Sequence, residues 1–482
     1  MTRGRNGGDG LDAIVVGAGP NGLAAAIELA RAGRSVRIYE AADEVGGGTR
    51  SAELTLPGFV HDPCASVHPL GIASPFLRSM DLARHGLEWV QPEAPVAHAL
   101  APGRSVVLER DLGSVDEALG ADADAWRRLY SPLVREWERL MPALLAPIVR
   151  PPSHPILMAR FGLPAMLPAT ALSRLAFREP AARALFSGMA AHSMLRLRQP
   201  LSASFGLVLG LLAHAVGWPL ACGGSGAIAS ALEAEARGLG VEIVTSHRVD
   251  ALADLPPARA VVLDLTPRQV LAIAGDRLPS GYRRQLEGYR YGPGVFKVDW
   301  ALDGPIPWRD PQTLRAGTVH LGGSMREVAS SEDAVGQGRI AERPFVLLVQ
   351  PTIADPSRAP AGKHVAWAYC HVPNGSTSDM TSAIEARVER FAPGFRDLVL
   401  ARATKDAPAM EAYDANYVGG DINGGIGDWR QLLFRPVVRW YPYASPDGGL
   451  FLGSSSTPPG GGVHGMSGMF AAREAERALC RT

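Results

Sequence analysis

The strongest hydrophobic pattern of the chain lies near its start. Residues 13–16 form a short apolar run with β-branched side chains, which predicts a buried parallel strand. Residues 23–32 then place apolar side chains at helical spacing without Pro or Gly, and residues 35–39 form a second strand-like run. The pattern therefore predicts a strand, a helix and another strand in succession.

The glycines between the first strand and the helix have the spacing of a nucleotide-binding turn. Gly17, Gly19 and Gly22 give the pattern G-x-G-x-x-G. The first allows a tight turn, the second lets a pyrophosphate approach the backbone, and the third lets the helix pack closely on the strand. Glu40 ends the second strand, about 20 residues further on, where a carboxylate can accept hydrogen bonds from a ribose. These features predict a dinucleotide site at the start of the helix, where free N–H groups face the phosphates; the alternative is an ordinary tight turn.

The middle of the chain has a different pattern. Residues 76–200 are expected to be mainly helical, with Pro-rich breaks, and residues 201–216 are almost entirely apolar. This apolar run is short for a membrane span and contains Ser202, Ser204 and His214. It therefore favours a buried helix or the wall of a tunnel over a transmembrane helix.

Strand patterns return in the second half of the chain. A mixed or antiparallel sheet, forming a substrate domain, is predicted from residues 295–300, 345–350 and 365–371. The first unit is expected to gain further strands from residues 241–244, 247–249 and 259–265.

Two more glycine-rich loops suggest contact with a large ligand. Residues 46–48 are three consecutive glycines, whose backbone can lie flat against such a ligand. A plain nicotinamide enzyme does not need this second cluster, whereas FAD would run past it, so the pattern favours a flavoprotein. Near the end of the chain, residues 450–452 predict a strand, and residues 458–466 lead into a helix that continues to Leu479. The start of that helix can stabilise negative charge on a ligand.

Composition excludes several classes of protein. The 482-residue chain has a formal net charge of zero, which argues against a nucleic-acid partner. Four scattered cysteines form no C-x-x-C pair, so neither a zinc site nor a dithiol redox pair is expected. Isolated thiols fit a reducing cytoplasm, and the absence of a signal peptide is expected because the first apolar run is the strand itself. Residues 1–10 are expected to be disordered. Residues 224–226 match a second nucleotide fingerprint only superficially, because residues 218–223 do not have a strand pattern.

Taken together, the motifs resemble the phytoene desaturase-like flavoproteins of the amine oxidase superfamily. This branch includes carotenoid desaturases, carotenoid isomerases and retinol saturases. The resemblance rests on the motifs G-A-G-P-N-G with Glu40, V-G-G-G-T-R, G-W-P…G-G-S-G-A-I and S-T-P-P-G-G-G-V-H-G-M-S-G. It covers residues 11–82 and from about residue 217 to the C-terminus, and the middle helical region only loosely.

The resemblance implies FAD as the cofactor and assigns residues to it. The residues it places against FAD are Gly17, Gly19, Pro20, Asn21, Gly22, Glu40, Ala41, Gly46, Gly47, Gly48, Thr49, Val249, Gly462, Val463, His464 and Met466. Amine oxidases often carry Arg directly after the paired glycines, where this chain has Gly48, and this departure favours the desaturase-like branch.

Two residues are candidates for catalysis. Lys297 resembles the lysine that amine oxidases place near flavin N5; alternatively, it lies on the exposed face of a strand. His464 can contact flavin or substrate, or only cap the last helix. Trp440 and Tyr443 can line a substrate cavity or pack in the core.

The expected architecture is an α/β protein with a discontinuous Rossmann-type FAD-binding domain and a substrate domain of sheet and helices. The expected FAD segments are 11–75, 217–288 and 426–482, and the substrate segments are 76–216 (helical) and 289–425 (sheet). The expected function is an FAD-dependent oxidoreductase that acts on an apolar small molecule, with oxygen, a quinone or another diffusible acceptor. A flavin amine oxidase and an FAD-binding protein with little redox turnover are the alternatives. Metal and nucleic acid are not expected, whereas a homodimer and peripheral membrane contact stay open for this cytoplasmic protein.

Overall fold

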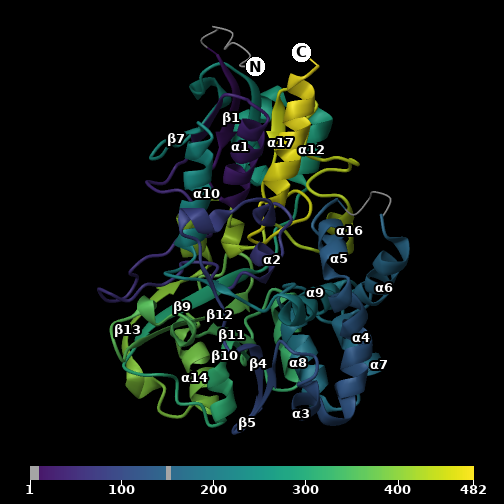
Figure 1. Cartoon of the computed structure of the whole chain (residues 1–482), viewed down its shortest axis with the longest axis vertical. Coiled ribbons are helices and arrows are strands. Elements are labelled where there is room, and N and C mark those ends of the chain that lie inside the picture. Colours follow the sequence, from purple (N-terminus) through teal and green to yellow (C-terminus); the bar gives the residue numbers. More distant parts are fainter. Residues whose placement is uncertain (1–9, 148–152, 482) are drawn as a thin grey trace.

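The chain folds around two β-sheets that lie in opposite halves of the molecule, as Figure 1 shows. The computed structural model describes residues 10–147 and 153–481. The expectation of disorder for residues 1–10 therefore falls, except for Gly10, outside the described residues. Helices cover the five-stranded sheet in one half, and a layer of helices packs beside the seven-stranded sheet in the other.

The first sheet is parallel and has the strand order β14-β8-β1-β2-β7. Its strands are β1 (Leu11–Val16), β2 (Val36–Tyr39), β7 (Glu242–Val244), β8 (Ala258–Leu263) and β14 (Leu450–Leu452). The helices of this half are α1 (Pro20–Arg31), α10 (Gly226–Gly238), α11 (Pro267–Ala274), α12 (Ser280–Glu287) and α17 (Met466–Leu479). The central strand β1 is apolar on both faces: Ala13 and Val15 pack in one hydrophobic cluster, and Ile14 and Val16 pack in another. Three separate stretches of sequence contribute strands to this sheet.

The strand expected at residues 247–249 does not form. Ser246 has a positive φ of 53°, which turns the chain out of the extended conformation directly after β7. The His247 N–H still donates to the Glu40 carbonyl at 2.8 Å, so one bond remains where a strand was expected.

The second sheet is mixed and has the order β13-β9-β12-β11-β10-β4-β5. Its strands are β4 (Ala94–Ala101), β5 (Arg104–Leu108), β9 (Gly294–Leu302), β10 (Ala316–Leu321), β11 (Val346–Val349), β12 (His364–Val372) and β13 (Val399–Lys405). β10 pairs in parallel with β4, and the other neighbours are antiparallel. Together the two sheets confirm the predicted α/β class with a Rossmann-type unit and a mixed sheet.

The expectation that residues 76–200 are mainly helical is wrong for β4 and β5. β4 is buried along most of its length, and most residues on both of its faces are small or apolar. The sequence therefore lacks the alternation of polar and apolar residues that marks a half-buried strand. Gly103, with a φ of 77°, makes the turn into β5. These two strands extend the second sheet beyond β10.

Most of the remaining described residues of this middle region form the helical layer. Its helices are α3 (Val115–Leu119), α4 (Ala123–Arg135), α5 (Trp137–Leu144), α6 (Pro155–Ala165), α7 (Ala169–Ala176), α8 (Pro180–Ala191) and α9 (Ser202–Ala215). The apolar run of the sequence is α9, and most of its side chains are buried, as predicted. In the described ranges no single helix has both the length and the apolar character to cross a membrane; α6 and α7 meet those criteria only together, and they bend by 104°.

Shorter elements complete the fold. They are α2 (Pro69–Ile72), β3 (Trp89–Val90), β6 (Leu220–Ala221), α13 (Met325–Val335), α14 (Thr381–Phe391), α15 (Ala407–Tyr413) and α16 (Trp429–Leu433). Contrary to expectation, residues 218–223 do contain a strand, β6. It pairs antiparallel with β3 in a separate ribbon, so it does not build a second nucleotide-binding unit.

Candidate functional site

A cavity of about 1110 Å³ lies between the two sheets and the helical layer. One end is formed by the glycine turn after β1, and the walls continue past the loops at residues 47–48 and 461–464. Beyond them the cavity meets the face of β10, β11 and β12 and the helices α5, α6 and α9. A ligand at one end can therefore meet a second ligand arriving from the helical layer.

The glycine turn forms the nucleotide end of the cavity. Gly17, Gly19, Pro20 and Asn21 all line it. Gly17 has a φ of 98°, which favours glycine, and helical bonding begins only where Leu23 N–H donates to the Gly19 carbonyl at 2.9 Å. The earlier N–H groups therefore have no helical acceptor, as an anion site requires.

Gly22 does not line the cavity but explains the close packing behind it. A Cβ at this position would lie 2.0 Å from the Gly17 carbonyl oxygen, so only glycine lets the helix approach the turn. This matches the role that the fingerprint predicts for its third glycine.

Glu40 lies at the end of β2 and lines the same end of the cavity. One of its carboxylate oxygens accepts from Ala18 N–H at 2.7 Å, and the other accepts from Ala42 N–H at 2.9 Å. Arg50 contacts the carboxylate at 3.4 Å. An ionised carboxylate has about four acceptor sites, so Glu40 is held in place and keeps capacity for a ribose.

Asp264 is a residue of this end that the sequence analysis missed. Its side chain accepts a hydrogen bond from Gly22 N–H at 2.8 Å and lines the cavity beside Gly17 and Gly19. Burial, together with the nearby carboxylates, raises its pKa to about 8, so the group is neutral at pH 7. Its position directly after β8, at the carboxyl edge of the sheet, is the signal that could have revealed it.

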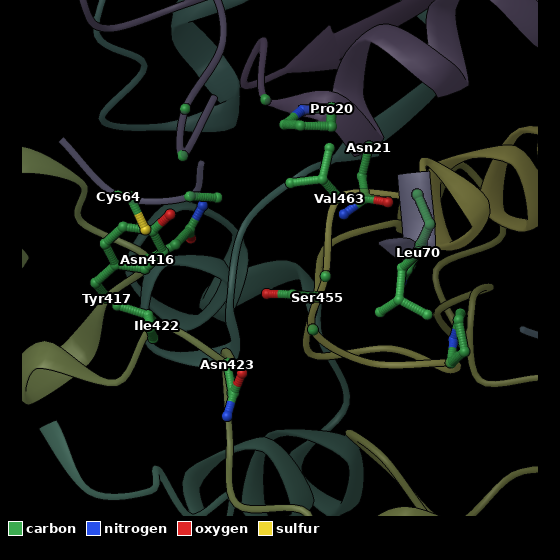
Figure 2. A pocket seen from close by; sticks show the side chains of 18 of the residues that line it. Pro20, Asn21, Cys64, Leu70, Asn416, Tyr417, Ile422, Asn423, Ser455 and Val463 are labelled. Carbon is green, nitrogen blue, oxygen red and sulfur yellow. The ribbon is translucent and has the colours of Figure 1, made fainter. Parts of the chain in front are cut away.

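The expected flavin end is built from the two other glycine loops. Gly47, Gly48, Gly462, Val463 and His464 line the cavity, as do Ala41 and Val249 nearer the nucleotide end. Figure 2 shows Cys64, Asn416 and Tyr417 on one side of this space and Leu70 and Val463 on another. A Cβ at Gly48 would lie 2.2 Å from the Tyr417 hydroxyl, so a larger residue there would displace this wall.

Besides Gly22, three expected cofactor contacts do not line the cavity. Gly46 donates its N–H to the Ala18 carbonyl, Thr49 donates its hydroxyl to the Gly46 carbonyl, and Met466 donates its N–H to His464 Nδ1. All three are buried behind the loops and shape them from within. They were expected to contact the cofactor because they are adjacent in sequence to residues that do line the cavity.

His464 caps the last helix. Its Nδ1 accepts from Met466 N–H at 3.0 Å, and its Nε2 contacts the Gly460 carbonyl at 3.2 Å. Burial lowers its pKa to about 4, so the ring is neutral. Because both ring nitrogens are engaged, the side chain holds the loop and has no free nitrogen for proton transfer.

Lys297 lies behind the wall of the cavity. All of β9 is buried, so the alternative of an exposed strand face is wrong. Its ammonium is paired with the Asp299 carboxylate and lies 4.9 Å from the centre of the Trp367 ring, which does line the cavity. The structure therefore places the Trp367 indole, and not the Lys297 ammonium, on the wall of the space expected for the flavin.

Two aromatic residues near the C-terminus do not reach the cavity either. Trp440 is 73 % exposed, so neither expectation for it is right. Tyr443 is buried, stacks on Phe470 and donates to the Pro458 carbonyl at 3.0 Å, which makes it a core residue.

The cavity walls fit a dinucleotide cofactor. A Cβ at Gly47 would lie 3.2 Å from the Gly19 Cα, so the second glycine loop touches the first and only glycines leave the passage open. A helix N-terminus, a held carboxylate and this glycine passage lie in line in one cavity. That arrangement accommodates an extended molecule with a pyrophosphate near its middle.

Comparisons with known proteins agree with this geometry. A model of an NAD(P)-binding Rossmann-like domain matches residues 15–81. The rat (Rattus norvegicus) pyridine nucleotide-disulfide oxidoreductase domain-containing protein 2 is 26% identical over 97% of this chain and 94% of its own. Phytoene dehydrogenase from Streptomyces griseus is 25% identical over 83% of this chain and 80% of its own. The solved structure of a putrescine oxidase variant shares the fold, with a TM-score of 0.64 at 18% identity, and the match covers 98% and 99% of the two chains.

Proposed function

We propose that the chain belongs to the superfamily of flavin-dependent oxidoreductases that includes phytoene desaturases and amine oxidases, and that it binds FAD and dehydrogenates an apolar small molecule. The observation that carries this proposal is one continuous cavity. It joins a nucleotide end with the glycine fingerprint and Glu40 to a chamber lined by apolar side chains. A redox cofactor and an apolar substrate can therefore meet inside the protein.

The chain's own residues bind and orient the cofactor. The N-terminus of α1 takes the pyrophosphate, Glu40 accepts hydrogen bonds from the ribose, and the loops at 47–48 and 461–464 enclose the ring system. When bound, FAD would supply the hydride acceptor for dehydrogenation. The protein contributes position, polarity and exclusion of water.

The composition of the chamber supports an apolar substrate. Its helical walls include Leu144, Met158, Phe161, Phe205, Val208 and Leu209. The Asp, Glu, Lys and Arg residues of the whole cavity wall are Glu40, Arg50, Arg248, Asp264 and Asp414. These five ionisable side chains belong to the nucleotide side, so none of them faces a substrate in the chamber.

One observation favours amine oxidation as a second candidate. Trp367 and Tyr369 lie side by side on the cavity wall, with ring centres 5.9 Å apart and planes 14° apart. Two parallel aromatic rings can receive a substrate cation. The chamber nevertheless offers an ammonium group no carboxylate among its described walls, which places the apolar substrate first.

We also propose that the chamber opens toward a membrane surface. Met166 and Trp429 line the cavity and are 63 % and 56 % exposed, so they mark a mouth between the end of α6 and α16. Ile156 and Leu163 add exposed apolar surface on α6, the type of surface that inserts among lipid headgroups.

Three experiments test these proposals. The purified protein should show the visible spectrum of oxidised flavin and release about one FAD per chain on denaturation; a folded but colourless protein would contradict the proposal. Anaerobic photoreduction followed by mixing with oxygen then separates an active oxidoreductase from a protein that only binds flavin. For the membrane, Ile156→Ser with Leu163→Ser should reduce flotation with phosphatidylcholine–phosphatidylglycerol vesicles, and equal flotation of wild type and variant would refute that contact.

A further inference from the structure

Two polar side chains interrupt the apolar wall of the substrate chamber where it meets the second sheet. They are Thr318 on β10 and His192, which directly follows α8. Their neighbours on the cavity wall are Trp218, Leu347 and Val349. Neither side chain takes part in the nucleotide end described above.

The Thr318 hydroxyl is buried without a partner. The side chain is 2 % exposed, and its oxygen has no hydrogen-bond partner among the described residues. An unsatisfied buried hydroxyl is costly and uncommon, because folding removes its water without replacing it. Ser204 offers a contrast on the same cavity, since its hydroxyl donates to the Leu201 carbonyl at 2.6 Å. Of Thr318 and Ser204, only Thr318 therefore has a hydroxyl whose hydrogen-bonding capacity is unused by the described residues.

His192 is prepared to give or accept a hydrogen bond. Its Nε2 lies 2.9 Å from the Nε2 of His320, so one nitrogen must donate and the other must accept. Burial lowers the pKa of His192 to about 3, and that of His320 well below its ordinary value, so both rings are neutral. When the proton of the shared bond belongs to His192, its Nδ1 is an acceptor; when it belongs to His320, the His192 Nδ1 carries a proton and donates.

The fold brings the two groups to the same part of the cavity. Thr318 and His320 are two residues apart on β10, so their side chains share one face of the sheet, about 7 Å apart along the strand. His192 packs onto His320 from α8 with ring centres 5.1 Å apart. In the described ranges no group of three or more His, Cys, Asp or Glu side chains has a metal-binding arrangement, so a metal does not explain the pair.

We propose that Thr318 and His192 form a subsite for one oxygen atom, of a hydroxyl or a carbonyl group, on an otherwise apolar substrate. The Thr318 hydroxyl donates to that oxygen. His192 Nδ1 accepts from a hydroxyl or donates to a carbonyl, according to the proton position in the His192–His320 bond. This subsite rests on the proposed function and narrows it, because a pure hydrocarbon would leave both groups without partners.

Binding of volatile probes tests the subsite without any redox turnover. The flavin-containing protein is equilibrated with 1-octanol, 2-octanone or n-octane, and the bound fraction is measured from the loss of probe from the headspace. We expect Thr318→Val, which keeps the side-chain shape, to weaken the binding of 1-octanol and of 2-octanone on the order of fivefold, which is the factor for one neutral hydrogen bond. Binding of n-octane should not change. The matched control Ser204→Ala should leave all three affinities as in the wild type.

A spectroscopic readout tests His192 separately. With ¹⁵N-labelled histidine, the imidazole signals that disappear in His192→Gln identify this residue. 1-Octanol should shift its Nδ1 signal, and n-octane should not.

Equal binding of 1-octanol to wild type and Thr318→Val would overturn the subsite. It would also be overturned if Thr318→Val weakened the binding of n-octane to the same extent, or if Ser204→Ala weakened the binding of 1-octanol as much as Thr318→Val does. An unmoved His192 signal on 1-octanol binding would also overturn it. The flavin spectrum of the same samples distinguishes these failures from a failure of the proposed function. Missing flavin refutes the cofactor, whereas normal flavin with unselective probe binding refutes only the subsite.

Discussion

The substitution Asp264→Asn tests the electrostatics of the nucleotide end. Asn has the same shape as a protonated Asp, and its side-chain oxygen can still accept the bond from Gly22 N–H that Asp264 accepts at 2.8 Å. Burial is the largest cause of the raised pKa of Asp264, and the negative charges of Asp414 and Glu40 add to it. The variant therefore removes only the ability to ionise.

The sign of the effect follows from proton linkage. The pKa of Asp264 is raised from its ordinary 3.8 to about 8, so between those values the folded protein keeps a proton that the unfolded chain has released. The stability that this proton confers is complete below about pH 4 and is lost as the pH rises to about 8. Each pH unit within this window is worth at most about 1.4 kcal/mol.

Urea unfolding of the cofactor-free protein, followed by circular dichroism from pH 5 to pH 8, measures this loss. The wild type should lose about 2–4 kcal/mol relative to Asp264→Asn across the window, with the other titrating groups common to both. FAD brings further negative charge beside the carboxyl, so its affinity should also fall with pH more steeply in the wild type than in the variant. Parallel stability curves for the two proteins would refute the assignment of a neutral Asp264.

Four further predictions address the cofactor and its surroundings. Gly19→Val should abolish FAD retention, because its Cβ would lie 2.9 Å from the Asp264 carboxyl and its branches would fill the pyrophosphate passage; normal flavin content in a folded variant would contradict this. Glu40→Ala should weaken the binding of FAD by about 1–3 kcal/mol in a flavin titration. Asp43→Ala, at an exposed neighbouring position, should leave FAD binding unchanged. Lys297→Met should lower the free energy of unfolding by about 3–5 kcal/mol, because Asp299 loses its partner, and adding Asp299→Asn should recover part of this loss. Unchanged stability together with slower reoxidation of the flavin by oxygen would instead place the ammonium at the cofactor. NADH and NADPH should reduce the flavin poorly in stopped-flow mixing, since the ribbon at β6 builds no second nucleotide unit; rapid bleaching by either would show the opposite.

Local sequence rules predicted the parts of the site that depend on backbone geometry. The turn at Gly17 and Gly19 and the carboxylate after β2 follow from strand, turn and helix signals within a few dozen residues. The glycine loop at residues 47–48 was also recognisable, because consecutive glycines have few structural uses.

The parts that depend on tertiary packing could not be predicted in this way. Lys297 was placed at the flavin by likeness, but burial of both faces of β9 turns it into an ion pair with Asp299. β4 lacks the alternation of a half-buried strand, because neighbours cover both of its sides. Thr318 and His192 are 126 positions apart, so only the packing of α8 against β10 makes them one feature.

The position of α17 has a consequence for the biosynthesis of the protein. The helix packs so closely on α1 that a Cβ at Gly468 would lie 1.8 Å from the Asn21 carbonyl oxygen, and the loop before it closes the cavity with Gly462 and Val463. The ribosome synthesises the glycine turn after β1 hundreds of residues before it synthesises α17 and the loop that precedes it. The nascent chain therefore exposes an incomplete cofactor cradle throughout synthesis, and stable loading with cofactor has to wait until the last helix leaves the exit tunnel. Cofactor loading in the cell is thus expected at the step where α17 packs onto α1.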